Sequence, residues 1–376
     1  MSPPTLHFVS GMATPPVNQL LAALAARSDL RLRLWYAVET DSKLYPWQTN
    51  PTHEVQRAEI YGKRWPSPRM IRLAFGRHDD GFMIAGWLSP TMRMLIPTLA
   101  AQRRRFAFFS DRPDDKQRLL ATSLVRGMYL GILRRSSTVF GLGGTAVQYF
   151  ADQGVPPERL CNLPLPVELP EAVRSRMPSR DEIRTRFDVS PTDFFVVTGS
   201  RLIESKGFDL LLAAVRCLSQ TERGRVKLLI VGSGPEKDRL EAMAKQSTLG
   251  ALVRFEPWME FVDFCGCIAA ADLVVHPARS DPFGGISLTA VGLGVPVIGS
   301  RQSGSAVELV EDGVNGFLYD ATDTKTLAER MGRLMNEPDL RASMANAARG
   351  VAARWTAERL ADTLVRRLFE DGILRG

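Results

Sequence analysis

The sequence predicts an α/β fold made of two doubly wound domains, and three observations support this prediction. Short apolar segments alternate with amphipathic ones in both halves of the chain, as in parallel sheets covered by helices on both faces. A length of 376 residues with 45% hydrophobic composition suffices for two cores of ordinary size. Between the halves, residues 162–193 change from a proline-rich opening to a strongly charged end, which predicts the domain boundary there.

The first domain is predicted at residues 1–165, followed by a linker at 166–193. Its expected elements are, in order, a strand at 6–10, a loop at 11–16, a helix at 17–27 and strands at 32–38, 82–85, 106–110 and 138–141. The first four of these elements form one βαβ unit. Helical stretches between the later strands fit a sheet that is wound on both faces.

The second domain is predicted at residues 194–355, where the alternation restarts. Its expected strands are residues 194–199, 226–232, 252–256, 273–276 and 296–299, and its expected helices are residues 209–218, 238–246, 264–271 and the segment after Gly284. A last helix within 356–376 is predicted to cross back onto the first domain. Ligands of such sheets bind at the carboxyl ends of the strands, so we expect the paired domains to enclose a cleft.

A charge-free apolar stretch after Asp281 predicts an anion-binding turn. Phe283, Gly284 and Gly285 lie between the expected strand 273–276 and a helix, in D-P-F-G-G-I-S-L-T. Backbone N–H groups at a helix start lack intrahelical acceptors, and the helix dipole favours negative charge there. An anionic ligand is the first hypothesis for this turn.

Two cations follow the first strand of the second domain. Arg201 and Lys206 lie five residues apart in G-S-R-L-I-E-S-K-G. A diphosphate leaving group is stabilised by positive charge that is already in place. Together with the glycine turn near Phe283, the pair favours a diphosphate site over the alternative, a solvated loop.

A second glycine turn, V-G-S-G-P at residues 231–235, also follows a strand. It lacks the third glycine and the acidic partner of a dinucleotide site, so a dehydrogenase is disfavoured. Gly232 is interpreted either as a ligand contact or as a turn residue that needs positive φ.

The cysteines and histidines predict neither a metal site nor a nucleophile. Cys161, Cys217, Cys265 and Cys267 have no spacing that suits zinc or a disulfide framework. The four histidines form no Ser/His/Asp pattern, and His276, at the end of a buried strand, is interpreted as structural. We expect no metal and no cofactor.

Positive charge is concentrated in the first half of the chain. Residues 1–168 carry 21 Lys and Arg against 13 Asp and Glu, and residues 103–135 combine nine cations with a stripe of leucines and Met128. This composition fits either contact with an anionic membrane surface or an amphipathic helix packing on its own domain. No nucleic-acid partner is expected. The start of the chain lacks a charged region followed by an apolar run, so no signal segment is expected, and the uncharged run 282–300 is broken by glycines and two prolines. A cytoplasmic location is expected, with or without contact at the inner face of the membrane.

The second half resembles the nucleotide-sugar domain of the retaining glycosyltransferases of family four, the glycosyl transferases group 1. The resemblance covers about residues 194–350. It rests on G-S-R-L-I-E-S-K-G-F-D-L-L, V-G-S-G-P-E-K-D-R-L, V-R-F-E-P-W, A-A-D-L-V-V-H-P, D-P-F-G-G-I-S-L-T-A-V-G-L-G-V-P-V-I and S-G-S-A-V-E-L-V-E-D-G-V-N-G-F-L, in family order. It implies the GT-B fold, in which two Rossmann-like domains face an interdomain cleft.

The resemblance also implies roles for individual residues. Arg201 and Lys206 would hold the diphosphate of a nucleotide-sugar donor, and Asp281 would accept hydrogen bonds from the donor sugar. The other donor-binding candidates are Pro257, Trp258 and Met259 near the nucleobase, Phe283, Gly284 and Gly285 at the sugar and phosphates, and, with no position given, Gly11, Gly232 and Thr289. Asp111 and Arg112, after a strand of the first domain, are acceptor candidates, and the alternative for this segment is a helix cap at residue 114 or 115.

The sequence departs from the family where two glutamates are expected eight residues apart. Asp281 keeps a carboxylate, but Thr289 cannot hold a ribose diol through two acceptor oxygens. Three explanations stay open: another residue holds the ribose, the donor carries a deoxyribose, or transferase activity has been lost.

The expected function is metal-independent transfer of a sugar, with retention, from a nucleotide-diphosphate donor to a hydroxyl of a glycan or lipid-linked acceptor. Bacterial envelope or exopolysaccharide assembly would suit the basic first domain. The alternatives are a non-catalytic partner subunit and a nucleotide-sugar epimerase of the same fold.

Overall fold

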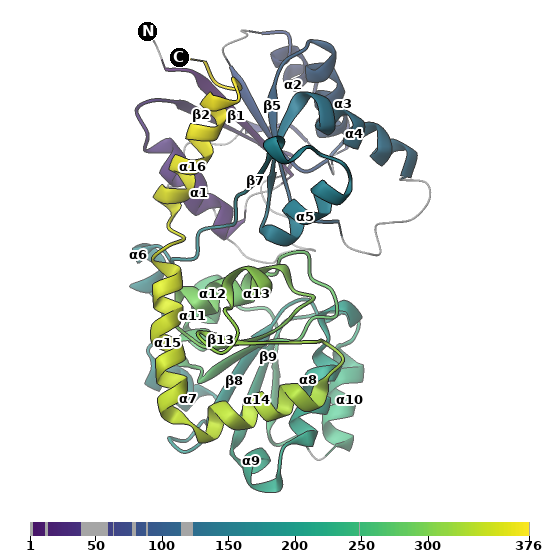
Figure 1. Ribbon diagram of the computed structural model, residues 1–376. Coiled ribbons are helices and arrows are strands. Elements are labelled where there is room, and N and C mark those ends of the chain that lie inside the picture. Colours follow the sequence, from purple (N-terminus) through teal and green to yellow (C-terminus); the bar gives the residue numbers. More distant parts are fainter. Residues whose placement is uncertain are drawn as a thin grey trace. The chain divides into compact units, whose positions relative to one another are not determined.

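Two parallel β-sheets organise the chain in the computed structural model (Figure 1). The structure describes residues 3–11, 14–38, 59–62, 64–76, 80–87, 89–113, 123–247 and 249–375. One unit comprises Met1–Pro166 with Trp355–Gly376, and the other comprises Val167–Arg354. Helices connect the strands in both units, so the predicted α/β class with two doubly wound sheets is confirmed.

The first unit contains a seven-stranded sheet in the order β3-β2-β1-β4-β5-β6-β7. Its strands are β1 (Thr5–Ser10), β2 (Arg31–Tyr36), β3 (Glu59–Ile60), β4 (Gly81–Ala85), β5 (Phe106–Ser110), β6 (Ser137–Gly141) and β7 (Leu160–Asn162). Its helices are α1 (Pro15–Ala25), α2 (Pro68–Leu73), α3 (Pro90–Ala101), α4 (Ser123–Ser136), α5 (Gly144–Asp152) and α16 (Ala357–Glu370). Chain order reverses at β1, which pairs with β2 and β4, so right-handed crossovers place helices on both faces.

The C-terminal helix α16 lies beside α1 in the first unit (Figure 1). Arg27, just after α1, forms an ion pair with Asp362 of α16. Asp371, the residue after this helix, accepts a hydrogen bond from the Thr138 hydroxyl at 2.6 Å. The last helix therefore packs on the first unit, although the second unit precedes it in the chain.

The second unit contains a six-stranded sheet in the order β10-β9-β8-β11-β12-β13. Its strands are β8 (Phe194–Gly199), β9 (Val226–Val231), β10 (Val253–Glu256), β11 (Leu273–His276), β12 (Val297–Ser300) and β13 (Gly316–Tyr319). Its helices are α6 (Glu171–Arg174), α7 (Arg180–Arg186), α8 (Phe208–Cys217), α9 (Gln220–Arg225), α10 (Lys237–Gln246), α11 (Phe261–Ala270), α12 (Gly285–Gly292), α13 (Gly304–Leu309), α14 (Thr324–Asn336) and α15 (Pro338–Ala352). Strands β8, β11, β12 and β13 are buried throughout, because helices cover both faces of the sheet.

The described part of the basic segment 103–135 packs mainly on the core of the first unit. Leu130 and Leu133 belong to its buried apolar cluster, whereas Met128 is exposed. Arg104 is buried as well, and its guanidinium donates to the carbonyl oxygen of Asp80 at 2.5 Å. Residues 114–122 lie outside the described residues. For the part that is described, these contacts favour the interpretation as a core-packing helix.

Within the described ranges, no helix is both long and apolar enough to cross a bilayer.

Candidate functional site

The candidate site lies at the carboxyl ends of β8 and β11. These strands are neighbours, and β8 also pairs with β9, so chain order reverses between β8 and β11. At such a reversal the loops diverge, and doubly wound sheets bind their ligands there. The loop after β8 carries Arg201 and Lys206, and the loop after β11 carries Asp281. The structure thus brings the two predicted segments together at the expected edge of the sheet.

Close backbone contacts hold the loop after β8 against the loop after β11. The Ser280 N–H donates to the carbonyl oxygen of Ser205 at 3.1 Å. Gly207 has a φ of +69°, and a Cβ at this position would lie 2.0 Å from the carbonyl oxygen of Pro277. Only glycine accommodates this conformation and this approach. The backbone on both sides of Lys206 is therefore fixed to the neighbouring loop.

Lys206 forms a buried ion pair with Asp281. Its Nζ lies 2.6 Å from Oδ2, and the two residues are 8% and 5% exposed. The same oxygen lies 3.1 Å from His276 Nε2, and His276 Nδ1 lies 2.8 Å from Ser287 Oγ. An ionised carboxylate can only accept, so Nε2–H donates to Asp281, and in a neutral ring Nδ1 accepts from the Ser287 hydroxyl. The four side chains form one hydrogen-bonded chain.

The hydrogen bonds among Asp281, His276 and Ser287 correct the expectation that the histidines enter no Ser/His/Asp arrangement. Spacings of five and eleven residues from His276 match no familiar pattern, and the side chains meet only because the turn folds back over β11. Ser287 is fully buried, so it offers no accessible nucleophile. His276 instead holds the carboxylate that contacts Lys206.

The electrostatics of the site keep Asp281 charged. Burial alone would raise the pKa of this carboxyl group, because it penalises the ionised form. The hydrogen bond from His276 and the charge of Lys206 outweigh burial, so the pKa of Asp281 lies well below its usual range. Since Oδ2 already has both of these partners, the predicted contact with a donor sugar would fall to Oδ1.

The glycine turn closes directly over this network. Gly284 has a φ of +82°, and a Cβ there would lie 2.4 Å from His276 Cε1 and 2.5 Å from Asp281 Oδ2. A Cβ on Gly285, by contrast, would meet no atom within 4 Å. Because α12 begins at Gly285, its first N–H groups have no intrahelical acceptors. A helix start with open space thus lies next to a buried lysine, which suits an anionic ligand.

Arg201 lies half-buried in a segment that packs against the glycine turn after β9. The Leu202 N–H donates to the Ser233 carbonyl oxygen at 2.9 Å. A Cβ on Gly232 would lie 1.9 Å from the carbonyl oxygen of Ser200. This close approach explains Gly232 by packing of the two loops, and its predicted contact with a ligand stays a prediction.

Thr289 is buried on α12, and its hydroxyl donates to the carbonyl oxygen of Gly285 at 3.1 Å. This bond to the preceding turn of its own helix uses the one proton of the hydroxyl, whose oxygen can still accept. Pro257, Trp258 and Met259 follow the edge strand β10, which β9 separates from β8. Their predicted position at a nucleobase stays a prediction.

The remaining predicted residues belong to the first unit. Gly11 follows the carboxyl end of β1, and its carbonyl oxygen accepts from the Val38 N–H at 3.2 Å. Asp111 and Arg112 follow the carboxyl end of β5, where the Ser110 hydroxyl donates to the Asp111 carbonyl oxygen at 3.0 Å. All three lie at the ligand-binding edge of their own sheet. The alternative cap at residue 114 or 115 lies outside the described residues.

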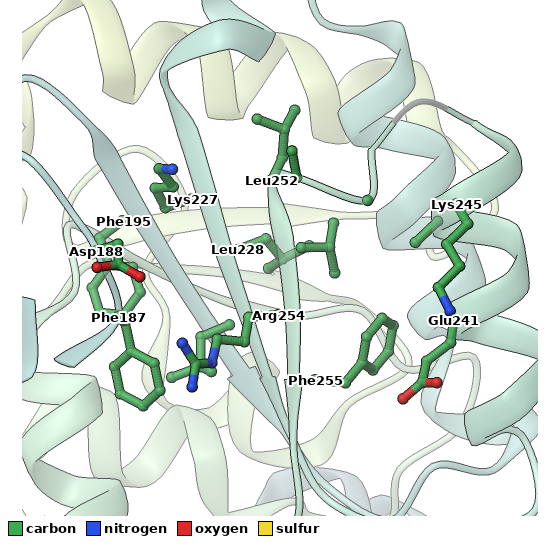
Figure 2. Close-up of a pocket in the computed structure, with 15 residues that line it drawn as sticks. Phe187, Asp188, Phe195, Lys227, Leu228, Glu241, Lys245, Leu252, Arg254 and Phe255 are labelled. Carbon is green, nitrogen blue, oxygen red and sulfur yellow. The ribbon is translucent and has the colours of Figure 1, made fainter.

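A separate cavity of about 380 Å³ opens beside the edge strand β10 (Figure 2). Side chains of both charges line it, and Arg254 lies over the ring of Phe187 at 5.1 Å. Neither Arg201, Lys206 nor Asp281 lines this cavity. We therefore assign it no part in the chemistry of the site.

Comparisons with known proteins agree with this geometry. The sequence profile of the family described as "Glycosyl transferases group 1" matches residues 179–351. D-inositol 3-phosphate glycosyltransferase of Frankia alni is 32% identical over 374 residues, which cover 91% of this chain and 89% of that protein. Lipopolysaccharide core biosynthesis glycosyltransferase LpsD of Rhizobium meliloti is 29% identical over 188 residues, covering 50% of this chain and 52% of that protein. For several curated relatives the match spans about half of their length.

Solved structures share the fold. The crystal structure of Anabaena HepE in complex with UDP superposes with a TM-score of 0.77 at 19% identity, covering 97% of this chain and 100% of that chain. The same protein in complex with UDP-glucose gives a TM-score of 0.76. The architecture is therefore GT-B, as the resemblance implies, with one Rossmann-like sheet in each unit.

Proposed function

Because this chain belongs to the glycosyl transferases group 1 family, we propose that it moves a sugar from a nucleotide-diphosphate donor to a hydroxyl acceptor. One observation carries the proposal. The ammonium group of Lys206 lies beside the start of α12 at the chain reversal of the second sheet, held there by Asp281. Positive charge and free backbone N–H groups at one point are what a diphosphate needs.

The proposed chemistry follows from the charges and retains configuration. The bond between the anomeric carbon and the diphosphate oxygen breaks, and the acceptor oxygen bonds to that carbon from the same face. The departing phosphate oxygen takes the acceptor's proton, so no protein nucleophile is required. Lys206, Arg201 and the amides near Gly284 stabilise the charge that grows on the diphosphate, without recourse to a metal. The carboxylate of Asp281 offsets positive charge on the sugar ring.

The donor is proposed to be a nucleotide sugar, in line with the HepE complexes that contain UDP and UDP-glucose. Thr289 donates its one hydroxyl proton within α12 and carries no carboxylate, so three explanations stay open: another residue holds the ribose, the donor is a deoxyribonucleotide sugar, or transferase activity has been lost. Equal turnover of matched ribo- and deoxyribonucleotide donors would dispose of the second explanation.

The acceptor is proposed to be a glycan or a lipid-linked glycan of bacterial envelope or exopolysaccharide synthesis. The basic first unit favours an anionic acceptor, and LpsD supports the link to envelope glycans. We further propose a cytoplasmic location, with or without peripheral contact at the inner face of the membrane.

A donor panel tests this function directly. The protein is incubated with UDP-, GDP-, ADP- and dTDP-sugars, with and without lipid-extracted envelope acceptors, and products are separated by mass spectrometry. Release of nucleoside diphosphate together with a glycosylated acceptor supports the proposal. Recovery of an epimerised nucleotide sugar would indicate an epimerase. Binding without turnover would indicate the non-catalytic partner subunit, the alternative that Thr289 keeps open.

A further inference from the structure

A second ion pair joins the loop after β11 to the start of α8, the helix that directly follows the loop carrying Lys206. Arg279 Nη1 and Nη2 lie 2.6 and 2.7 Å from the two carboxylate oxygens of Asp209. Arg279 comes two residues before Asp281, and Asp209 comes three residues after Lys206. This fork-to-fork contact needs a planar guanidinium, because the point charge of a lysine cannot bond both oxygens in parallel.

The same guanidinium also reaches the backbone of the turn that carries Lys206. Arg279 Nη1 donates to the carbonyl oxygen of Glu204 at 3.1 Å, and Glu204 begins the 3₁₀ turn η4 (Glu204–Lys206). Arg279 therefore holds the chain before Lys206 through Glu204 and after it through Asp209. With two acceptors, Nη1 has used both of its protons, so this nitrogen does not serve a phosphate.

We propose that Arg279, together with Asp209, is a positioning residue that keeps Lys206 where the donor diphosphate binds. The inference rests on the proposed function and assigns to it two residues outside the predicted site. The pair is neutral as a whole, so it fixes geometry without adding net charge. Arg239 extends the contact to α10, with its Nη2 3.8 Å from Asp209 and an ion pair to Glu236.

The two charges persist at neutral pH. Burial would raise the pKa of Asp209, but the hydrogen bonds and charge of Arg279 outweigh it and lower that pKa. The hydrogen bond to Asp209 in turn raises the pKa of Arg279. The ion pair between Arg279 and Asp209 is therefore present over the whole pH range in which enzyme activity would be measured.

The test compares Arg279→Lys with Arg180→Lys. Arg180 offers a matched control at the other end of β11, because it bonds the Asp272 carboxylate and the Ala270 carbonyl oxygen, each at 2.9 Å. Calorimetry measures the affinity for UDP and for inorganic pyrophosphate, a probe without a base. Initial rates give kcat and KM for donor and acceptor, and thermal unfolding is followed by circular dichroism.

Arg279→Lys is expected to weaken both diphosphate probes by about tenfold and to lower kcat/KM for the donor, with the KM for the acceptor unchanged. Arg180→Lys is expected to bind like the wild type. Asp209→Asn, which removes the other partner, is expected to reproduce the loss. Wild-type affinity in Arg279→Lys, or equal losses in both lysine variants, would overturn the inference. Failure of the wild-type protein to bind or turn over any donor would instead refute the proposed function.

Discussion

At the residue scale, the central feature is the buried ion pair between Lys206 and Asp281. The contribution of this pair to the stability of the fold does not by itself explain why it is present. Replacing a buried ion pair by apolar side chains is often neutral or stabilising, because desolvation offsets the attraction between the charges. Lys206 and Asp281 lie at the edge of the sheet where ligands bind, beside the start of α12. We infer that the pair presents charge to a ligand, with His276 as the support of the carboxylate.

Replacing Lys206 by alanine is expected to abolish turnover without unfolding the protein. Loss of a fixed donor to a developing negative charge typically lowers kcat by about 10²–10³-fold. The hydrogen bond from His276 still reaches Asp281, which limits the loss of stability. Initial rates and thermal unfolding measure the two effects, and Lys237→Ala, in the half-buried pair with Glu241, controls for removal of a lysine charge. Normal activity in Lys206→Ala would remove its proposed role.

An added methyl group is expected to destabilise the protein at Gly284 but not at Gly285, the two glycines of the turn. Gly284→Ala would place a Cβ 2.5 Å or less from Asp281 and His276 at a φ of +82°, and should lower the free energy of unfolding by about 1–3 kcal/mol or more. Gly285→Ala meets open space, so its stability should stay near that of the wild type. Urea unfolding of both variants measures the contrast. Similar costs at the two positions would contradict the described turn.

The lowered pKa of Asp281 predicts how stability depends on pH. In the folded state the pKa of the carboxyl group lies below its ordinary value of 3.8. Its contribution to the free energy of unfolding is therefore complete above the unfolded pKa and is lost as pH falls toward the folded one. Urea unfolding of wild type and Asp281→Asn at pH 7 and at about pH 3.5 compares the two proteins. The stability difference should shrink at the lower pH. A constant or growing difference would argue against an ionised, paired Asp281.

At the element scale, burial decides which strands the sequence reveals. The apolar runs of β5 and β8 are buried, and both were predicted within one residue of their bounds. The strands β3 and β7 were missed, because two or three residues at a sheet edge show no period. Also missed was β13, whose four residues G-F-L-Y directly follow a turn, E-D-G-V-N.

Because α16 packs in the first unit, removing a buried side chain from this helix is expected to destabilise that unit and to leave the second unit little changed. Leu364 is fully buried on α16, which packs beside α1, so Leu364→Ala should lower the stability of the first unit by about 2–5 kcal/mol. Hydrogen exchange should show faster opening of α1 and β1, with the second unit little changed. Arg366→Ala, at an exposed position of the same helix, serves as the control. Loss of protection confined to the second unit would contradict the assignment of α16.

At the scale of the whole molecule, the sequence places the site better than it explains it. Arg201 and Lys206 follow an apolar strand, and the glycine turn follows another, so both could be predicted at one edge of a sheet. The contacts that hold them could not be predicted, because they arise only when loops meet across a chain reversal. The contact between Arg279 and Asp209, seventy positions apart in the chain, is of this kind, whereas the bonds of His276 form because the turn after β11 folds back over that strand.

The most direct measurement is a crystal structure of the protein with UDP or the preferred nucleoside diphosphate of the donor panel. The account predicts a phosphate oxygen within hydrogen-bonding distance of Lys206 Nζ and of a backbone N–H at the start of α12, with Arg201 turned toward it. A diphosphate bound elsewhere, with Arg201 and Lys206 both remote from phosphorus, would contradict the central claim.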